Sequence, residues 1–177
     1  AAGLLLLLIA LPAFGQKPYR QGTTAANFLE IGYGGAGIAM GDAYVSMAQD
    51  LSSIYWNPAG LAYMEQNEAQ FTYQPWLADI NTSFAGVGLV LPNVGTLAFS
   101  IMQVGYGDMD VTTLEMQNGT GEQFTASDYS FNLSFGRQLA QWFAFGASAK
   151  YISSKIWHTS ARALATDLGV IVNTNFL

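Results

Sequence analysis

Cysteine is absent from the 177 residues, which excludes disulfide bonds and thiolate metal sites within this sequence. Charge is also scarce, because only 10% of the residues are Asp, Glu, Lys or Arg, against about 25% in ordinary soluble domains. The six basic residues are outnumbered by twelve acidic ones and are scattered along the chain. A nucleic-acid partner requires clustered Lys and Arg, so we expect none.

Long hydrophobic runs are missing as well. After the first fifteen residues no stretch holds 18 consecutive apolar residues, which excludes transmembrane helices. Yet 51% of the residues are hydrophobic, 14% are aromatic and 19 are glycine. This combination with few charges is typical of a β-barrel whose outer surface faces lipid. A soluble β-sandwich with an apolar surface is the alternative that composition leaves open.

The first fifteen residues are predicted to be a signal peptide that is cleaved after Gly15. An apolar run ends at Pro12, and Ala13 and Gly15 then supply the small residues that a cleavage site needs. The run over residues 4–11 is too short to span a membrane, which takes about 20 apolar residues in a helix. A buried N-terminal helix is the alternative. We therefore expect an exported protein.

Beyond residue 66, large apolar side chains alternate with small ones at a period of two, which predicts strands. In DYSFNLSFG (128–136), aromatic or leucine side chains occupy every second position, with Ser, Asn and Gly between them. A water-facing sandwich strand would carry Lys, Glu and Thr at those intermediate positions. Small residues inward and large apolar residues outward predict a transmembrane barrel. The alternating stretches are residues 84–91, 95–101, 128–136, 142–151 and 163–172.

We predict an all-β, antiparallel outer-membrane barrel segment of about six strands, each 10 to 13 residues long and beginning near Ala69. Short connections are expected to alternate with longer ones, with 91–95 and 137–141 short, and 76–80, 105–124 and 157–161 longer. Outer-membrane barrels have short periplasmic turns and longer extracellular loops, so the alternation favours a meander. Because a closed barrel needs about eight strands, we expect the N-terminal part of a longer protein.

Residues 50–64, DLSSIYWNPAGLAYM, differ from the strands that follow. Asp50 is expected to cap a short helix over residues 51–56. Asn57 precedes Pro58, which moves Asn57 out of the helical region and lets it cap a second turn that starts at Pro58. Two short helices that meet at Asn-Pro would form a rigid elbow suited to the mouth of a barrel. An ordinary connecting turn is the alternative.

The stretch GGAGIAMGDAYVSMAQDLSSIYWNPAGLA (34–62) resembles the start of the FadL-like outer-membrane barrels, especially those of the PorV/PorQ family. GASAKYISSKI (146–156) and ALATDLGVIV (163–172) resemble the same family in the expected order, so the similarity covers about residues 30–172. The resemblance implies a barrel of about fourteen strands with an N-terminal helical hatch.

The resemblance also implies where the elbow lies. Residues 16–66 would form the hatch and residues 67–177 the first part of the barrel wall, with the hatch closing the periplasmic side. Tyr55 and Trp56 would pack against the wall. The expected hatch motif is Asp50, Tyr55, Trp56, Asn57, Pro58, Ala59 and Gly60.

For function, the resemblance implies a component of type IX secretion that receives cargo proteins at the translocon and passes them to the surface attachment machinery. A FadL-type channel for long-chain fatty acids or other hydrophobic small molecules is the alternative, and a purely structural barrel is a third. Expected partners are outer-membrane lipid and either the translocon with its cargo or hydrophobic small molecules.

Catalysis, cofactors and metals are not expected. His158, the one histidine, adjoins Thr159 and Ser160, but a nucleophile and its base must lie within about 3 Å, which neighbours on a loop rarely achieve. The acidic residues lack metal-ligand spacing, although the loop over 105–128 leaves a Ca²⁺ site as an alternative. Lys150 and Asp167 are predicted to form a luminal pair on neighbouring strands, which either supports the hatch or neutralises its own charges.

Overall fold

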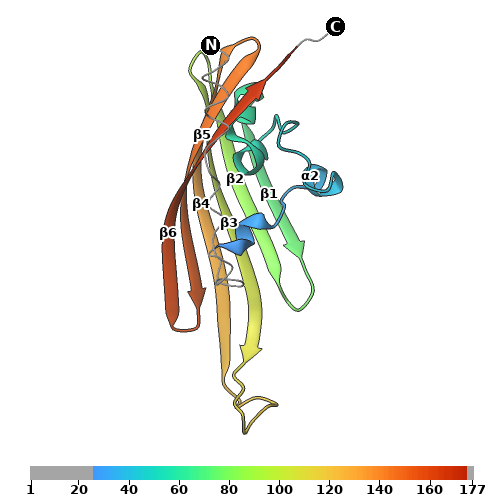
Figure 1. Ribbon diagram of the computed structural model, residues 1–177, viewed down its shortest axis with the longest axis vertical. Helices are drawn as coiled ribbons and strands as arrows, with labels where there is room; N and C mark the ends of the chain where they lie inside the picture. Colours follow the sequence, from blue (N-terminus) through green and yellow to red (C-terminus); the bar gives the residue numbers. More distant parts are fainter. Residues whose placement is uncertain (1–25, 175–177) are drawn as a thin grey trace, which may run out of the picture.

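The computed structural model describes residues 26–174, which form one six-stranded antiparallel sheet with a short helical segment against one face (Figure 1). The segment contains η1 (Asn27–Glu30), α2 (Gly35–Ala39), α3 (Ser53–Trp56) and η2 (Pro58–Tyr63). The strands pair in chain order and are β1 (Glu68–Pro75), β2 (Asn81–Leu91), β3 (Gly95–Asp110), β4 (Gln123–Ala140), β5 (Phe143–Ile156) and β6 (Thr159–Val172). The all-β class and the count of six strands are confirmed.

The helices within residues 26–174 are all too short, or too polar, to cross a membrane. The predicted signal peptide, residues 1–15, lies outside the described part of the chain. We call residues 26–66 the N-terminal segment.

The two faces of the sheet differ as the alternation predicted. On the outer face large apolar side chains are exposed, for example Leu133 at 52% and Leu168 at 77%. On the inner face small residues such as Ala98, Ser100 and Ser134 are buried. Period-two burial follows from strand geometry, because successive side chains point to opposite faces. The N-terminal segment covers part of the inner face, so the outer face is the apolar surface that lacks a protein cover among the described residues.

Strand lengths depart from the predicted 10 to 13 residues, because β3 and β4 have 16 and 18 residues and β1 has 8. The predicted loop over 105–124 is wrong at both ends, since only residues 111–122 connect β3 to β4. The pairing resumes beyond a bulge, with Asp108 opposite Thr125. Tyr106 Oη also donates a hydrogen bond to an Asp128 carboxylate oxygen at 2.6 Å, which joins the two strands. The polar residues at the adjoining ends of β3 and β4 are therefore paired strand residues and not part of the loop.

Two predicted connections are shorter than expected. Residues 141–142 join β4 to β5 and residues 157–158 join β5 to β6, so both are two-residue hairpin turns. The turn at 76–80 has the predicted bounds, and residues 92–94 form the remaining short turn. The two longest connections, 76–80 and 111–122, lie at the same end of the sheet, but the two-residue turn at 157–158 lies at that end too, so the predicted alternation of short and longer connections is wrong between β5 and β6.

The core lies between the N-terminal segment and the inner face. Its larger part is a cluster of buried side chains contributed by both the segment and the strands, and Tyr33 of the segment stacks on Phe84 of β2 with ring centroids 3.6 Å apart. The segment contributes Phe28, Tyr33, Leu51, Ile54, Leu61 and Met64, and the strands contribute Phe84, Ala98, Met102, Val104 and Ile152.

Candidate functional site

The elbow is built by two short helices that meet at Asn57. Asn57 is extended, with φ −162°, and its side-chain oxygen accepts a hydrogen bond from the Ala59 backbone N–H at 3.1 Å. The sequence favours this arrangement because Pro58 excludes Asn57 from the helical region and itself lacks an N–H to satisfy at the first helical position. The second turn is a 3₁₀ helix, Pro58–Tyr63, and the structure places Asn57, Pro58, Ala59 and Gly60 together at the break.

The first helix is shorter than the predicted 51–56, because α3 begins at Ser53. Asp50 accepts a hydrogen bond from the Ser52 backbone N–H at 2.9 Å, so it shapes the turn before the helix instead of capping it. The Leu51 N–H donates to a carboxylate oxygen of Glu68 on β1 at 3.0 Å. That bond holds residue 51 against the sheet and takes it out of the helix.

The elbow rests on a row of three glycines that cross the inner face. Gly136 on β4, Gly146 on β5 and Gly169 on β6 are direct partners in the strand register. A Cβ at Gly146 would overlap the backbone of Pro58 and Ala59, and one at Gly136 would lie 2.7 Å from the Pro58 carbonyl oxygen. A Cβ at Gly169 would overlap the Asn57 side chain. The three glycines therefore let the elbow approach the backbone of the sheet directly.

Hydrogen bonds connect the N-terminal segment to both edges of the sheet. At β1, Tyr33 Oη donates to Gln70 Oε1 at 2.7 Å, in addition to the bond between Leu51 and Glu68. At β6, Asn57 Nδ2 donates to the Val170 carbonyl oxygen at 3.3 Å. The Asn57 side chain thus caps η2 with its oxygen and binds the last described strand with its nitrogen.

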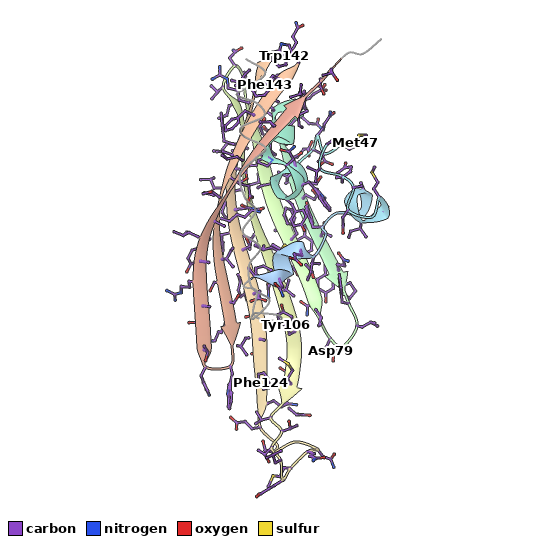
Figure 2. The ribbon with its side chains drawn as sticks, in the orientation of Figure 1. Met47, Asp79, Tyr106, Phe124, Trp142 and Phe143 are labelled. Atoms are coloured by element: carbon purple, nitrogen blue, oxygen red, sulfur yellow. The ribbon has the colours of Figure 1, made fainter. Side chains whose placement is uncertain are left out.

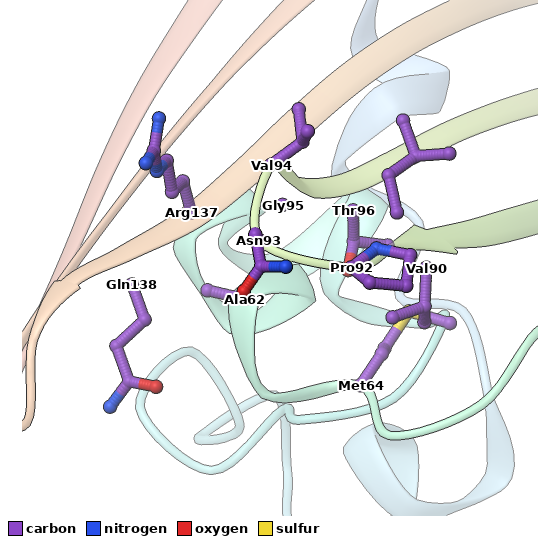
Figure 3. A pocket seen from close by; sticks show the side chains of 11 residues that line it. Ala62, Met64, Val90, Pro92, Asn93, Val94, Gly95, Thr96, Arg137 and Gln138 are labelled. Atoms are coloured by element: carbon purple, nitrogen blue, oxygen red, sulfur yellow. The ribbon is translucent and has the colours of Figure 1, made fainter.

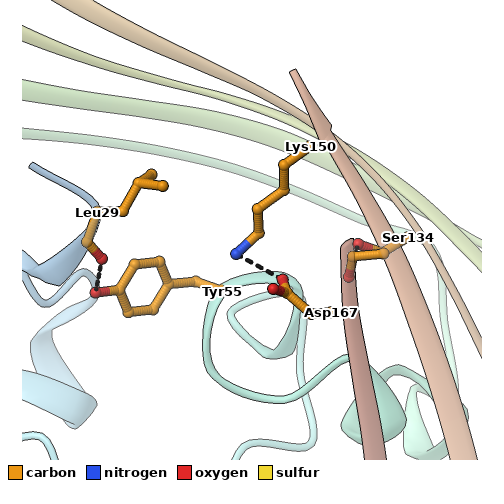
Figure 4. Close-up of polar contacts among 6 residues, drawn as sticks. Leu29, Tyr55, Ser134, Lys150 and Asp167 are labelled. Atoms are coloured by element: carbon orange, nitrogen blue, oxygen red, sulfur yellow. Dashed lines mark hydrogen bonds and ion pairs between the residues drawn. The ribbon is translucent and has the colours of Figure 1, made fainter. Parts of the chain in front are cut away.

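Tyr55 and Trp56 make their aromatic contacts and hydrogen bonds within the segment, whereas we expected them to pack on the wall. Tyr55 Oη donates to the Leu29 carbonyl oxygen at 2.9 Å, and Trp56 Nε1 donates to the Tyr33 carbonyl oxygen at 3.1 Å (Figure 4 shows the first). Burial raises the pKa of Tyr55 to about 12, with smaller contributions from Asp42 and Glu30. Both rings therefore organise the segment. Tyr55 also packs against the core cluster that the segment shares with the strands, and Tyr33 stacks on Phe84 of the wall.

Lys150 on β5 and Asp167 on β6 form an ion pair, with Nζ and Oδ2 2.6 Å apart (Figure 4). The Lys150 side chain is 13% exposed and that of Asp167 39%. A cavity of about 440 Å³ separates this pair from the elbow and is lined by residues of both, among them Tyr55 and Pro58. The ion pair faces the elbow across this cavity and forms no direct hydrogen bond to it among the described contacts.

A second cavity, of about 280 Å³, lies where the segment leads into the sheet (Figure 3). It is bounded by the β2–β3 turn at 92–94, by Ala62 and Met64 of the segment, and by Arg137 and Gln138 of β4. Its open, mixed lining carries no cluster of reactive groups. Elsewhere, the His158 ring lies beside that of its neighbour Trp157 at the exposed β5–β6 turn, tilted by 31° with ring centroids 4.8 Å apart. No group of three or more acidic or histidine side chains within residues 26–174 is arranged to hold a metal ion.

The sequence matches the family model described as type IX secretion system protein PorV over residues 14–172. The chain belongs to the PorV family. The matched region takes in the N-terminal segment and all six strands, so both parts of the site lie within it. No curated protein matches the chain.

Membership of the PorV family gives the chain a role in type IX secretion, in association with other components of that system. The family is one of secretion-system proteins of the outer membrane and not of enzymes, which agrees with the expected location. Nothing in the comparison supports the FadL-type uptake of hydrophobic compounds.

The glycine row is the part of the site that the sequence did not reveal. The three glycines were expected on the small-residue face, but their alignment depends on register. A bulge between Gln138 and Ala140 shifts the β4–β5 pairing, and the short turn at 157–158 sets that of β5 and β6. The sequence did contain one signal. Each glycine occupies an inward-facing position of its strand, and the two glycines of each paired set lie a similar number of residues from the turn that joins their strands.

Proposed function

We propose that this PorV-family chain forms part of the wall of an outer-membrane β-barrel that shuttles cargo in type IX secretion, receiving proteins at the translocon and passing them to the attachment machinery. In this proposal residues 16–66 form the hatch inside the barrel and residues 67–177 begin a wall of about fourteen strands. The family match supports the secretion role. The uncovered apolar outer face of the sheet is the observation that supports the membrane wall.

The dimensions of the outer face suit a membrane. Aromatic side chains stand at both ends of β5, with Trp142 and Phe143 at one end (Figure 2) and Trp157 directly after the other. At about 3.3 Å per residue and a tilt of about 40°, β5 would span roughly 35 Å across the bilayer. That height places the aromatic residues at the two interfaces, where outer-membrane barrels carry their aromatic girdles.

The elbow lies at the end of the sheet where both described connections are short, the turns at 92–94 and 141–142. Gly136 is close to the end of β4 and Gly146 to the start of β5, on either side of the turn at 141–142. Short turns face the periplasm in outer-membrane barrels. The hatch would therefore close the periplasmic mouth, which leaves the long-loop end and the outer surface of the barrel for cargo and for secretion partners.

The test uses the full-length gene in its own host. We expect deletion to leave cargo proteins in the periplasm, and the protein purified from outer membranes in mild detergent to carry translocon subunits and cargo with a shared C-terminal sorting domain. Normal cargo display, together with stoichiometric fatty acid and no protein partner, would identify an uptake channel instead. Recovery of the protein from the soluble periplasm would exclude the barrel as well.

A further inference from the structure

We propose that the N-terminal segment is a fixed strut of the wall and does not act as a gate, so that it stays in place throughout the secretion cycle. The proposal rests on the proposed function only in placing the sheet in a barrel wall with the segment inside. A gate would have to separate from the wall at a low free-energy cost, as moving lids and loops do. Three features of the described residues oppose such a separation.

The first feature is that the segment is bound at both sides of the sheet. Tyr33 and Leu51 form hydrogen bonds with Gln70 and Glu68 on β1. On the opposite side, Asn57 binds the Val170 carbonyl of β6, and Tyr63 Oη accepts a hydrogen bond from Asn173 Nδ2 at 3.0 Å. A segment attached along one edge could swing about it, but attachments at β1 and β6 remove that hinge.

The second feature is that segment and wall share one core. Leu51, Ile54 and Leu61 of the segment are fully buried, and the wall residue Val104 in the same cluster is fully buried too. Moving the segment out would expose the apolar side chains of both parts at once. Separation would therefore resemble loss of the core more than the opening of a lid.

The third feature is the fit at the glycine row. The backbone of Pro58 and Ala59 lies against the backbone of Gly146, with no side chain between these two stretches. A short rigid elbow that touches a sheet backbone to backbone cannot slide across neighbouring residues with a Cβ. Pro58 and the Asn57 cap also restrict rearrangement of the elbow itself.

Hydrogen exchange on the full-length protein in detergent tests the strut without any substitution. We expect amides of residues 53–63 to exchange as slowly as those of residues 129–136 in β4, within about tenfold, because both would open only with the whole core. Exchange of the elbow about a hundredfold or more faster than β4, with β4 still protected, would overturn the strut.

A disulfide lock gives the functional readout in cells. Ala59 and Ala144 are both fully buried in one small apolar cluster that joins η2 to β5, so Ala59→Cys with Ala144→Cys would fix the segment to the wall. The matched control is Ser134→Cys with Ser148→Cys, whose hydroxyl oxygens lie 2.8 Å apart within the wall. We expect cargo display to remain within about twofold of the reduced state for both pairs, since neither would block a required motion.

The opposite result would be loss of display only in the oxidised 59/144 pair, reversed by reductant, with the 134/148 pair unaffected. That result would show that the segment must move and would overturn the strut. It would leave the secretion role intact, because the reduced protein would still display cargo. Normal display after deletion of the whole gene would instead refute the proposed function.

Discussion

At the scale of single residues, the packing of the elbow on the inner face depends on three positions that have no Cβ. Gly136, Gly146 and Gly169 lie side by side in the register, and a Cβ at any of them would meet atoms of the elbow. At Gly146 those atoms are backbone, which cannot rotate away as the end of a long side chain can. Close packing of this kind makes one added methyl group costly.

We therefore expect Gly146→Ala to lower the free energy of unfolding of the full-length protein by about 1 to 3 kcal/mol, because the elbow or the strand must shift to admit the methyl group. Urea unfolding in detergent, followed by the difference in gel mobility between folded and unfolded protein, measures this change. Gly35→Ala is the matched control, since a Cβ there has no neighbour within 4 Å and the backbone needs no glycine. Equal stability of the two variants would refute the close packing of the elbow backbone on Gly146.

The sequence predicted which face of the sheet these glycines occupy, but not that they lie side by side. The alternation correctly assigned Gly136, Gly146 and Gly169 to the small-residue face. Their alignment follows from a bulge near Ala140 and a two-residue turn after Ile156, and neither has a strong signal in the sequence. A shift of one residue would have turned each glycine to the opposite face.

At the scale of elements, the elbow is the best-predicted feature and the strand ends are the worst. Asn-Pro has a local steric consequence that no tertiary contact needs to supply, so the break at Asn57 and the cap on Ala59 could be predicted. The start of α3 could not, because Leu51 is held by Glu68 from a strand 17 positions later in the chain.

The strand ends were mispredicted for a different reason. Polarity was taken to mark where a strand leaves the membrane and becomes a loop. In β3 and β4 the hairpin pairing continues through the polar residues Asp108 and Thr125, because backbone hydrogen bonding does not depend on hydropathy. Hydropathy reports the surroundings of a strand, whereas register and turns decide its length.

Asn57 provides the prediction at this scale, because its side chain has two separate tasks. Asn57→Ala removes the cap on η2 and the bond to Val170, and we expect it to cost about 1 to 2 kcal/mol of stability. Asn57→Ser retains an acceptor for the cap and loses the Nδ2 group that binds the Val170 carbonyl, so its cost should be about half as large. The same urea titration measures both variants. A serine variant as unstable as the alanine variant would show that capping contributes nothing.

At the scale of the whole molecule, one sheet separates two unlike environments. Its inner face is small and mildly polar and packs on the N-terminal segment, while its outer face carries large exposed apolar side chains. Composition predicted this arrangement before any strand was placed, because few charges and many aromatic residues leave little to face water. In a PorV-family protein that face has a natural environment in the lipid of the outer membrane.

The most direct measurement is the lipid exposure of single spin labels on the full-length protein in bilayers. The 177 residues contain no cysteine, so once any cysteine outside them is replaced, single labels can be introduced at Phe131 and Leu133 on the outer face of β4, and at the exposed Asn93 and Gln117 in connections at opposite ends. We predict that oxygen, which concentrates in lipid, relaxes the labels at 131 and 133 more than a water-soluble nickel complex does, with the reverse at 93 and 117. Strong relaxation by nickel at 131 and 133 would contradict a lipid-facing wall.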